Sequence, residues 1–322
     1  MTAPRAHAPV VVVSGMAGIG KTGFALHAAH QVRPDFPDGQ LYLDLHGATP
    51  GATPLDPARA LAALLRDLGV GPGLVPADSA SASALLRTVL ADSRTLLVLD
   101  DAASAAQVRP LLPAGPGCAV LVTSRQPLAT LGAAVRLRLG TLSPEEGVRL
   151  LRSTSGREWT PADAAPVARL AALCGRLPLA LKVVAARLAT RTALPVEDLV
   201  ARLSAHEDRL DHLELDDLSV RRTLAGAHDA LAASPLRRDR DAALALVRLG
   251  ALDLPEYTAP QLARLCGICL RRAEAALDRL EELALVEPVS TGRHAPHDLV
   301  RAYARELARR PHEEAPGPRP AA

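Results

Sequence analysis

Short apolar runs alternate with helix-period segments over the first part of the chain. Five runs have the length and β-type composition of strands, at residues 10–14, 40–45, 95–100, 119–124 and 134–139. Several of them are continuously apolar, which is typical of strands buried on both faces of a parallel sheet. Helical periodicity separates the runs, so right-handed βαβ units are expected. The pattern predicts an α/β domain over residues 9–141.

The hydrophobic pattern changes twice in the remainder of the chain. Helical signals alone follow the last strand, beginning with a capping-box pattern at Ser143 and Glu146, and they predict an α-helical domain over residues 142–216. Three or four helices, a hairpin-like stretch at 285–298 and a last helix come next. This order predicts a winged-helix domain over residues 217–310.

Composition and charge exclude several classes of protein but do not indicate one. The net charge of +2 is too small to indicate a nucleic-acid or anionic-membrane partner. Four scattered cysteines do not form the pattern of a secreted disulfide scaffold, and the apolar run at 10–13 is too short for a signal peptide or a membrane span. We therefore expect a cytoplasmic protein with no membrane partner, and flexible tails at residues 1–8 and 311–322.

The lysine content is unusual. Of 37 basic residues only Lys21 and Lys182 are lysines, and the preference for Arg and Ala is typical of GC-rich coding. Lys21 lies in the stretch GMAGIGKT, directly after the first predicted strand and before a predicted helix at 22–32. G-x-x-x-x-G-K-[ST] in this context is the P-loop motif.

The P-loop motif predicts a phosphate site with defined roles. Its glycines let the backbone curl so that N–H groups point at phosphate oxygens, and the following helix adds its positive end. Lys21 brings a compact ammonium to the phosphates, where a planar guanidinium would not fit, and Thr22 offers a hydroxyl to Mg²⁺. The predicted nucleotide-binding residues of the loop are Gly15, Met16, Ala17, Gly18, Ile19, Gly20, Lys21 and Thr22.

Two carboxylates follow the apolar strand in TLLVLDDA. Asp100, at the strand's carboxyl end, is predicted to hold Mg²⁺ together with Thr22, and Asp101 to orient the attacking water as catalytic base. The alternative for Asp101 is a helix cap, because a helical segment at 102–112 comes next.

Arg125 follows the next buried strand, in VLVTSR. The carboxyl ends of parallel strands share one edge of the sheet, so Arg125 is predicted to reach a γ-phosphate as a sensor. The alternative is an ordinary surface arginine, since the chain contains many.

The chain resembles the NB-ARC family of signal-transduction ATPases in five stretches taken together: GMAGIGKT, LLVLDDA, LVTSR, CGRLPLAL and the His-Asp pair before LVRAYARE. Within this family, FPDGQLYLDLHG, AAQVRPLLP and HDLVRAYARE are most similar to the nucleotide-binding part of actinobacterial antibiotic-regulatory transcription factors. The resemblance covers about residues 9–310. It implies a nucleotide switch, closed with ADP and open with ATP, that is at most a slow ATPase.

The resemblance also assigns residues outside the P-loop. Pro178 of GRLPLAL matches the family's GLPL proline, which packs near the nucleotide base, although Pro178 also fits as a helix-starting proline. His297 matches the histidine of the MHD motif, which reaches the β-phosphate of ADP, while Pro296 replaces its methionine. The alternative is a surface histidine before a last helix that Asp298 caps.

The family's segment that closes over adenine is not seen, because only nine residues precede Val10. An effector or sensor protein is expected to act in trans, with self-association in the ATP-bound state.

Two other functions compete with a nucleotide switch: a DNA-binding regulator and a P-loop kinase. A DNA-binding regulator would use the helix at 269–285, whose acidic residues outnumber its arginines and would repel phosphates, so direct DNA binding is not expected. A P-loop kinase would need an acceptor-binding lid, and no segment is recognised as one.

Overall fold

The structure is a computed structural model. It describes residues 7–49, 52–191, 193–205, 209–252 and 254–309. Nearly all of the first predicted tail and all of the second lie outside the described residues. Among the described helices, none has the combination of length and apolar character that crossing a bilayer requires.

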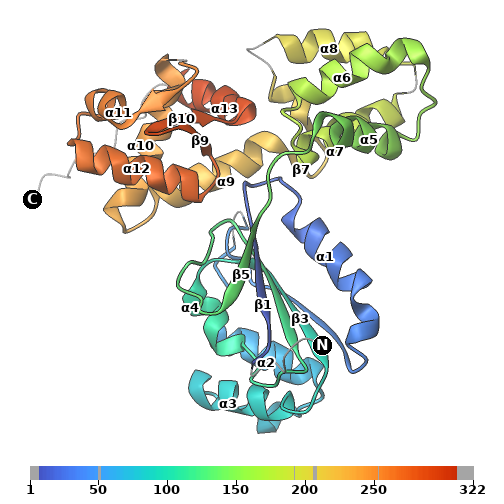
Figure 1. The fold of residues 1–322 in the computed structure, drawn as a ribbon, viewed down its shortest axis with the longest axis vertical. Helices are drawn as coiled ribbons and strands as arrows, with labels where there is room; N and C mark the ends of the chain where they lie inside the picture. Colours follow the sequence, from blue (N-terminus) through green and yellow to red (C-terminus); the bar gives the residue numbers. More distant parts are fainter. Residues whose placement is uncertain (1–6, 50–51, 192, 206–208, 253, 310–322) are drawn as a thin grey trace, which may run out of the picture.

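The first part of the chain forms a five-stranded parallel sheet with the strand order β2-β3-β4-β1-β5 (Figure 1). Each predicted strand is present within two residues of its expected ends. The strands are β1 (Val10–Ser14), β2 (Gly39–Asp44), β3 (Thr95–Ala102), β4 (Ala119–Ser124) and β5 (Ala134–Arg138). The prediction of an α/β fold with a parallel sheet is confirmed.

Helices cover both faces of this sheet. They are α1 (Lys21–Gln31), α2 (Pro57–Asp67), α3 (Ser79–Val89) and the short α4 (Ala105–Val108). In β3, Leu96 and Val98 pack toward α1, whereas Leu97 and Leu99 pack toward α2 and α3. The continuous apolar run of β3 is explained by this burial on both sides.

Four helices form the second part: α5 (Pro144–Ser155), α6 (Ala164–Leu173), α7 (Pro178–Thr190) and α8 (Val196–Ser204). The predicted capping box at the start of α5 is present, because the Ser143 hydroxyl accepts from the Glu146 N–H while the Glu146 carboxylate accepts from the Ser143 N–H. A two-residue ladder of β6 (Glu214–Leu215) and β7 (Leu218–Ser219) follows and was not predicted.

The third part combines helices with a small antiparallel sheet of order β8-β10-β9. The predicted hairpin at 285–298 corresponds to β9 and β10, whereas β8 was not predicted. In chain order the elements are α9 (Val220–Ala232), α10 (Arg237–Leu252), β8 (Tyr257–Thr258), α11 (Ala259–Cys266), α12 (Leu270–Glu282), β9 (Val286–Ser290), β10 (Arg293–Pro296) and α13 (Asp298–Arg309).

One hydrophobic core joins the second and third parts, and it also contains Met16 and Ile19 of the P-loop. These two side chains are only 4% and 5% exposed. The third part touches the sheet as well, since Arg138 of β5 donates to the Glu281 carbonyl of α12 at 2.9 Å. The P-loop therefore lies where the three parts of the chain meet (Figure 1).

Two buried helical glycines give a test of this packing. A Cβ on Gly250 of α10 would lie 2.0 Å from the Ala304 carbonyl oxygen of α13, whereas a Cβ on Gly147 of α5 would meet its nearest atom, the Ala171 Cβ, at 3.6 Å. Gly250→Ala should lower the free energy of unfolding by at least about 2 kcal/mol, because backbone must move. Gly147→Ala should raise it by up to about 1 kcal/mol through helix propensity. Chemical denaturation measures both, and equal effects would contradict the α10–α13 packing.

Candidate nucleotide-binding site

The P-loop connects β1 to α1 with the backbone conformation that its glycines permit. Gly15, Gly18 and Gly20 have φ values of 149°, 81° and 93°. A Cβ on Gly15 would also lie 2.8 Å from the Leu139 carbonyl oxygen, so both conformation and space favour glycine there.

Lys21 turns its ammonium back into the loop. Its Nζ donates to the carbonyl oxygens of Gly15 and Met16, each at 3.0 Å. Burial, together with the nearby Arg125, lowers the pKa of Lys21 to about 8, although Asp101 and Asp100 act in the opposite direction. The ammonium is thus held at the centre of the loop by short contacts that a planar guanidinium does not reproduce.

Asp100 is surrounded by hydroxyl groups at the end of β3. Thr22 Oγ1 donates to both of its carboxylate oxygens, at 2.9 and 3.1 Å, and Tyr42 Oη donates at 3.0 Å. Thr123 of β4 donates to Asp100 as well. The predicted pair of magnesium ligands, Thr22 and Asp100, therefore lies together.

Tyr42 was not anticipated from the sequence. It lies on β2, the strand beside β3, and its hydroxyl reaches the Asp100 carboxylate across the ladder. Burial and then the charge of Asp100 raise the pKa of Tyr42 well above its ordinary value, so the phenol stays a hydrogen-bond donor.

Asp101 occupies a distorted position in β3. Its φ is 49°, and the register of β3 against β4 shifts between Leu99 and Ala102. The carboxylate accepts from the Ala48 N–H at 2.9 Å and from Thr49 Oγ1 at 3.2 Å. The helix-cap alternative is wrong, because α4 begins at Ala105 and its N-cap is Ser104.

Arg125 points into the same region from the end of β4. Its Nη2 donates to the Ala48 carbonyl oxygen at 2.9 Å, while its Nη1 is buried and has no hydrogen-bond partner among the residues that the structure describes. Burial lowers the pKa of Arg125. A buried guanidinium with an unused donor is what an anionic ligand would satisfy, so the surface-arginine alternative does not describe this residue.

These groups line one cavity of about 520 Å³. Helix α7 closes it, because Leu179 N–H donates to the Gly18 carbonyl oxygen at 3.1 Å and Pro178 packs beside Gly20. The lining residues are Ala17, Gly18, Gly20, Lys21, Thr22, Gly23, Asp44, Thr49, Asp100, Asp101, Thr123, Arg125, Pro178, Leu179, Lys182 and Leu218.

A second cavity of about 490 Å³ adjoins the first and is more apolar. Pro178, predicted to pack near a base, begins α7 and lines both cavities. The apolar lining residues of the second cavity are Ile19, Phe24, Leu139, Leu142, Leu150 and Pro178.

His297 lies apart from the phosphate-side cavity. It lines a separate cavity of about 300 Å³ with Met16 and Ile19 of the P-loop. Its Nδ1 accepts from the Leu299 N–H at 3.2 Å, so its Nε2 carries the proton and donates to the Gly175 carbonyl oxygen at 2.9 Å. His297 also accepts the first helical backbone bond of α13, from Arg301, so His297 and not Asp298 caps this helix.

Few protein ligands are available for a metal ion. No group of three or more His, Cys, Asp or Glu side chains suited to a metal occurs among the described residues. Mg²⁺ commonly takes one or two protein ligands and completes its shell with phosphate oxygens and water, so Thr22 and Asp100 fit this ion when a nucleotide supplies the rest.

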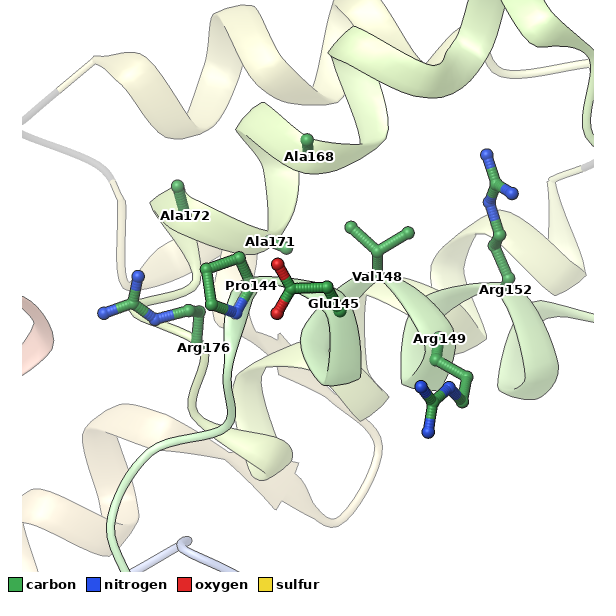
Figure 2. Close-up of a pocket in the computed structure, with 9 residues that line it drawn as sticks. All are labelled: Pro144, Glu145, Val148, Arg149, Arg152, Ala168, Ala171, Ala172 and Arg176. Carbon is green, nitrogen blue, oxygen red and sulfur yellow. The ribbon is translucent and has the colours of Figure 1, made fainter.

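A further hollow of about 530 Å³ lies between α5 and α6, away from the P-loop (Figure 2). Alanines form its floor, and Arg149, Arg152 and Arg176 surround it. Figure 2 shows the guanidinium groups of Arg149 and Arg152 pointing away from each other. The three cations do not converge, so the hollow lacks the geometry of an anion site.

No family model matches the sequence. The chain is 40% identical over 301 residues to regulatory protein AfsR from Streptomyces griseus, covering 94% of this chain and 30% of that protein. It is 38% identical over 309 residues to regulatory protein AfsR from Streptomyces coelicolor, covering 96% and 30%. The chain thus spans 30% of the length of these curated relatives.

Solved structures resemble the fold only loosely. One is a signal-transduction ATPase with numerous domains (STAND) with a tetratricopeptide repeat sensor from Pyrococcus horikoshii, at a TM-score of 0.40 and 20% identity, covering 94% of this chain and 41% of that one. Another is Cdc6p from Pyrobaculum aerophilum, at 0.40 and 16%, covering 95% and 89%. Scores this low carry no functional argument.

The parallel sheet, the P-loop after β1 and Asp100 at the end of β3 define an α/β P-loop NTPase fold. The sequence identity then places the chain more narrowly: it is similar to part of AfsR-type regulatory proteins, which supports the NB-ARC resemblance drawn from its motifs. The resemblance inferred from the motifs is confirmed.

The protonation state of His297 gives a pH prediction. Burial lowers the pKa of His297, against the smaller effects of the Gly175 carbonyl, Asp298 and Glu287, which favour the charged form. The unfolded chain then takes up the proton first as the pH falls through about 6.5, so acid should favour unfolding. Between pH 7 and 5 the wild-type protein should lose free energy of unfolding that His297→Ala does not lose. His27→Ala, at an exposed position of α1, controls for removal of a histidine. Parallel profiles for wild type and His297→Ala would contradict the buried neutral histidine.

Proposed function

We propose that this chain is an adenine-nucleotide switch that is closed with ADP and open with ATP. The convergence of the P-loop, Asp100, Asp101 and Arg125 on one cavity carries this proposal. Thr22 and Asp100 hold Mg²⁺, and the P-loop with Lys21 binds the phosphates. When bound, Mg²⁺ neutralises part of the phosphate charge.

Asp101 and Arg125 take the catalytic roles in this proposal. Asp101 orients the attacking water, and the unpaired Nη1 of Arg125 contacts the γ-phosphate. Asp101 also holds the backbone at Ala48, whose carbonyl Arg125 binds, so the two residues share one support. Hydrolysis through this arrangement is expected to be slow, because Asp101 is already engaged by two donors.

The apolar cavity beside the phosphate site is proposed to hold the adenine. Its lining by Leu139, Leu142, Leu150 and Pro178 suits a flat, weakly polar ring. These side chains belong to the linker after β5 and to the helical part, which supports a base clamped between two domains. The domain limits proposed are 9–141, 142–216 and 217–310.

Opening of the switch would separate parts of the chain that are in contact in this structure. The helices and antiparallel hairpin of the third part support a winged-helix domain. His297 binds Gly175 in this arrangement, so contact with an ADP β-phosphate would require the ring to leave that carbonyl. We propose that His297 stabilises the closed state, and that opening with ATP exposes surfaces for self-association.

The relatives extend the proposal to regulation. Because the matched proteins are regulatory proteins three times the length of the match, this chain is proposed to serve transcription regulation or a partner effector acting in trans.

DNA binding through α12 is less well supported. Arg272 forms two bonds to Asp241, at 2.6 and 2.9 Å, and Arg279 binds Asp239 at 2.8 Å. Both guanidinium groups are therefore satisfied within the chain, which leaves Arg271 as the remaining arginine of this described helix. A helix with so little free positive charge lacks the phosphate contacts that dominate affinity for DNA. A kinase function has no supporting observation.

Nucleotide binding and the need for lysine can be tested together. The wild-type protein should bind ADP more tightly than ATP, and nucleotide released on denaturation should be ADP. Lys21→Arg should abolish binding nearly as completely as Lys21→Ala, because a planar fork cannot take the position between two carbonyls at 3.0 Å. Calorimetry with and without Mg²⁺ measures this. No adenine-nucleotide binding by the wild type would overturn the proposed function, and normal binding by Lys21→Arg would overturn the argument from shape.

Substitutions of the two adjacent carboxylates should have different effects on binding and hydrolysis. Asp100→Asn should weaken Mg²⁺-dependent ATP binding, because it removes the charge beside Thr22. Asp101→Asn should leave binding nearly intact and remove any slow hydrolysis. Calorimetry and phosphate release measure the two effects. Equal hydrolysis by the wild type and Asp101→Asn would leave Asp101 with only its structural bonds to residues 48 and 49.

A further inference from the structure

The second lysine of the chain lies in the same cavity as the first. Lys182 is on α7, far from Lys21 in sequence, and lines the same phosphate-side cavity as the P-loop lysine. Among the described arginines and lysines other than Lys21, only Arg125 and Lys182 line this cavity. The position therefore calls for a physical explanation.

Lys182 has no bonding partner among the described residues. It makes no hydrogen bond or ion pair with any described residue, and its side chain is exposed. The carboxylates that share its cavity accept hydrogen bonds from other groups: Asp100 from three hydroxyl groups, Asp101 from residues 48 and 49, and Asp44 from the His46 backbone N–H. None of them forms a salt bridge with Lys182 in the described part of the chain.

The fold directs Lys182 toward the junction of two cavities. It follows Pro178 by four residues, so both lie on the same face of α7, one turn apart. The first turn of α7 rests on the P-loop through the bond from Leu179 to Gly18. Pro178 and Lys182 line both the phosphate-side cavity and the apolar cavity proposed for the base. A nucleotide lying across both would carry its phosphate chain past this junction.

We infer that Lys182 is a second phosphate-binding lysine, contributed by the helical part of the chain. This inference rests on the proposed nucleotide function. The Lys182 ammonium balances the phosphate charge from α7, whereas Lys21 does so from the P-loop, and Lys182 contributes only while α7 remains docked on the P-loop. Nucleotide charge thereby favours the docked arrangement, because the attraction between Lys182 and phosphate is lost when α7 moves away.

The test compares variants that replace a cationic side chain with a neutral polar one. In Lys182→Gln the dissociation constants for both ADP and ATP should rise about tenfold, the effect of losing one charge-assisted hydrogen bond. Added salt should weaken wild-type binding and reduce the difference between wild type and Lys182→Gln, because screening removes a Coulombic contribution. Arg191→Gln, at an exposed cation after the end of α7 and outside both cavities, is the matched control and should bind as the wild type does.

Each outcome has one interpretation. Dissociation constants of Lys182→Gln within twofold of the wild type overturn the role of Lys182 and leave the nucleotide function standing. A loss that salt does not reduce also overturns it, because a packing defect and not charge would then be responsible. Absence of nucleotide binding by the wild type would instead overturn the proposed function. Unchanged melting of Lys182→Gln without nucleotide shows that the variant is folded.

Discussion

The arrangement of the molecule depends on one constraint, that the P-loop must turn its backbone N–H groups toward a cavity. A loop that does so must direct its side chains elsewhere. Here Met16 and Ile19 enter the core of the helical and third parts, while Gly15 lies too close to the Leu139 carbonyl to carry a side chain. The phosphate site and the contact between the parts of the chain are therefore built by the same few residues, and neither can change without the other.

The turn before α7 shows how closely the parts are joined. Gly175 and Arg176 both have left-handed backbone conformations, with φ values of 59° and 53°. The Gly175 carbonyl accepts from His297 of the third part, and the Arg176 carbonyl accepts from Leu142 of the linker after β5. Three residues after Arg176, the Leu179 N–H donates to the Gly18 carbonyl oxygen. One turn thus bonds to three separate segments, and left-handed φ at the non-glycine Arg176 is a conformation that persists only where its surroundings hold it.

Much of the fold and the centre of the site could be predicted from sequence because their signals are local. The strands are apolar runs, the P-loop is one contiguous stretch, and Asp100 ends a buried strand. Tyr42 and Gly175 could not be predicted, because each matters through a partner on another element. The pairing of Tyr42 with Asp100 depends on strand order, and that of Gly175 with His297 on how two parts pack. The cap of α13 shows a limit of predicting helix ends from residue propensity. Aspartate is the better cap by propensity, yet His297 caps the helix, and its ring also reaches the Gly175 carbonyl of the helical part.

The charges of the cavity explain why a polyphosphate suits it better than an uncharged ligand. Three cations and three carboxylates line it, so the count alone predicts no preference for anions. Their bonding differs, however. The carboxylates accept from hydroxyl groups and backbone N–H groups, whereas, in the described part of the chain, Arg125 has an unused buried donor and Lys182 has no partner. Hydrogen bonds hold the carboxylates in place, whereas the two cations remain available to bind a ligand that enters the cavity. An anion that enters can therefore form charge-assisted hydrogen bonds with both cations without displacing an existing ion pair, which an uncharged ligand cannot do as strongly.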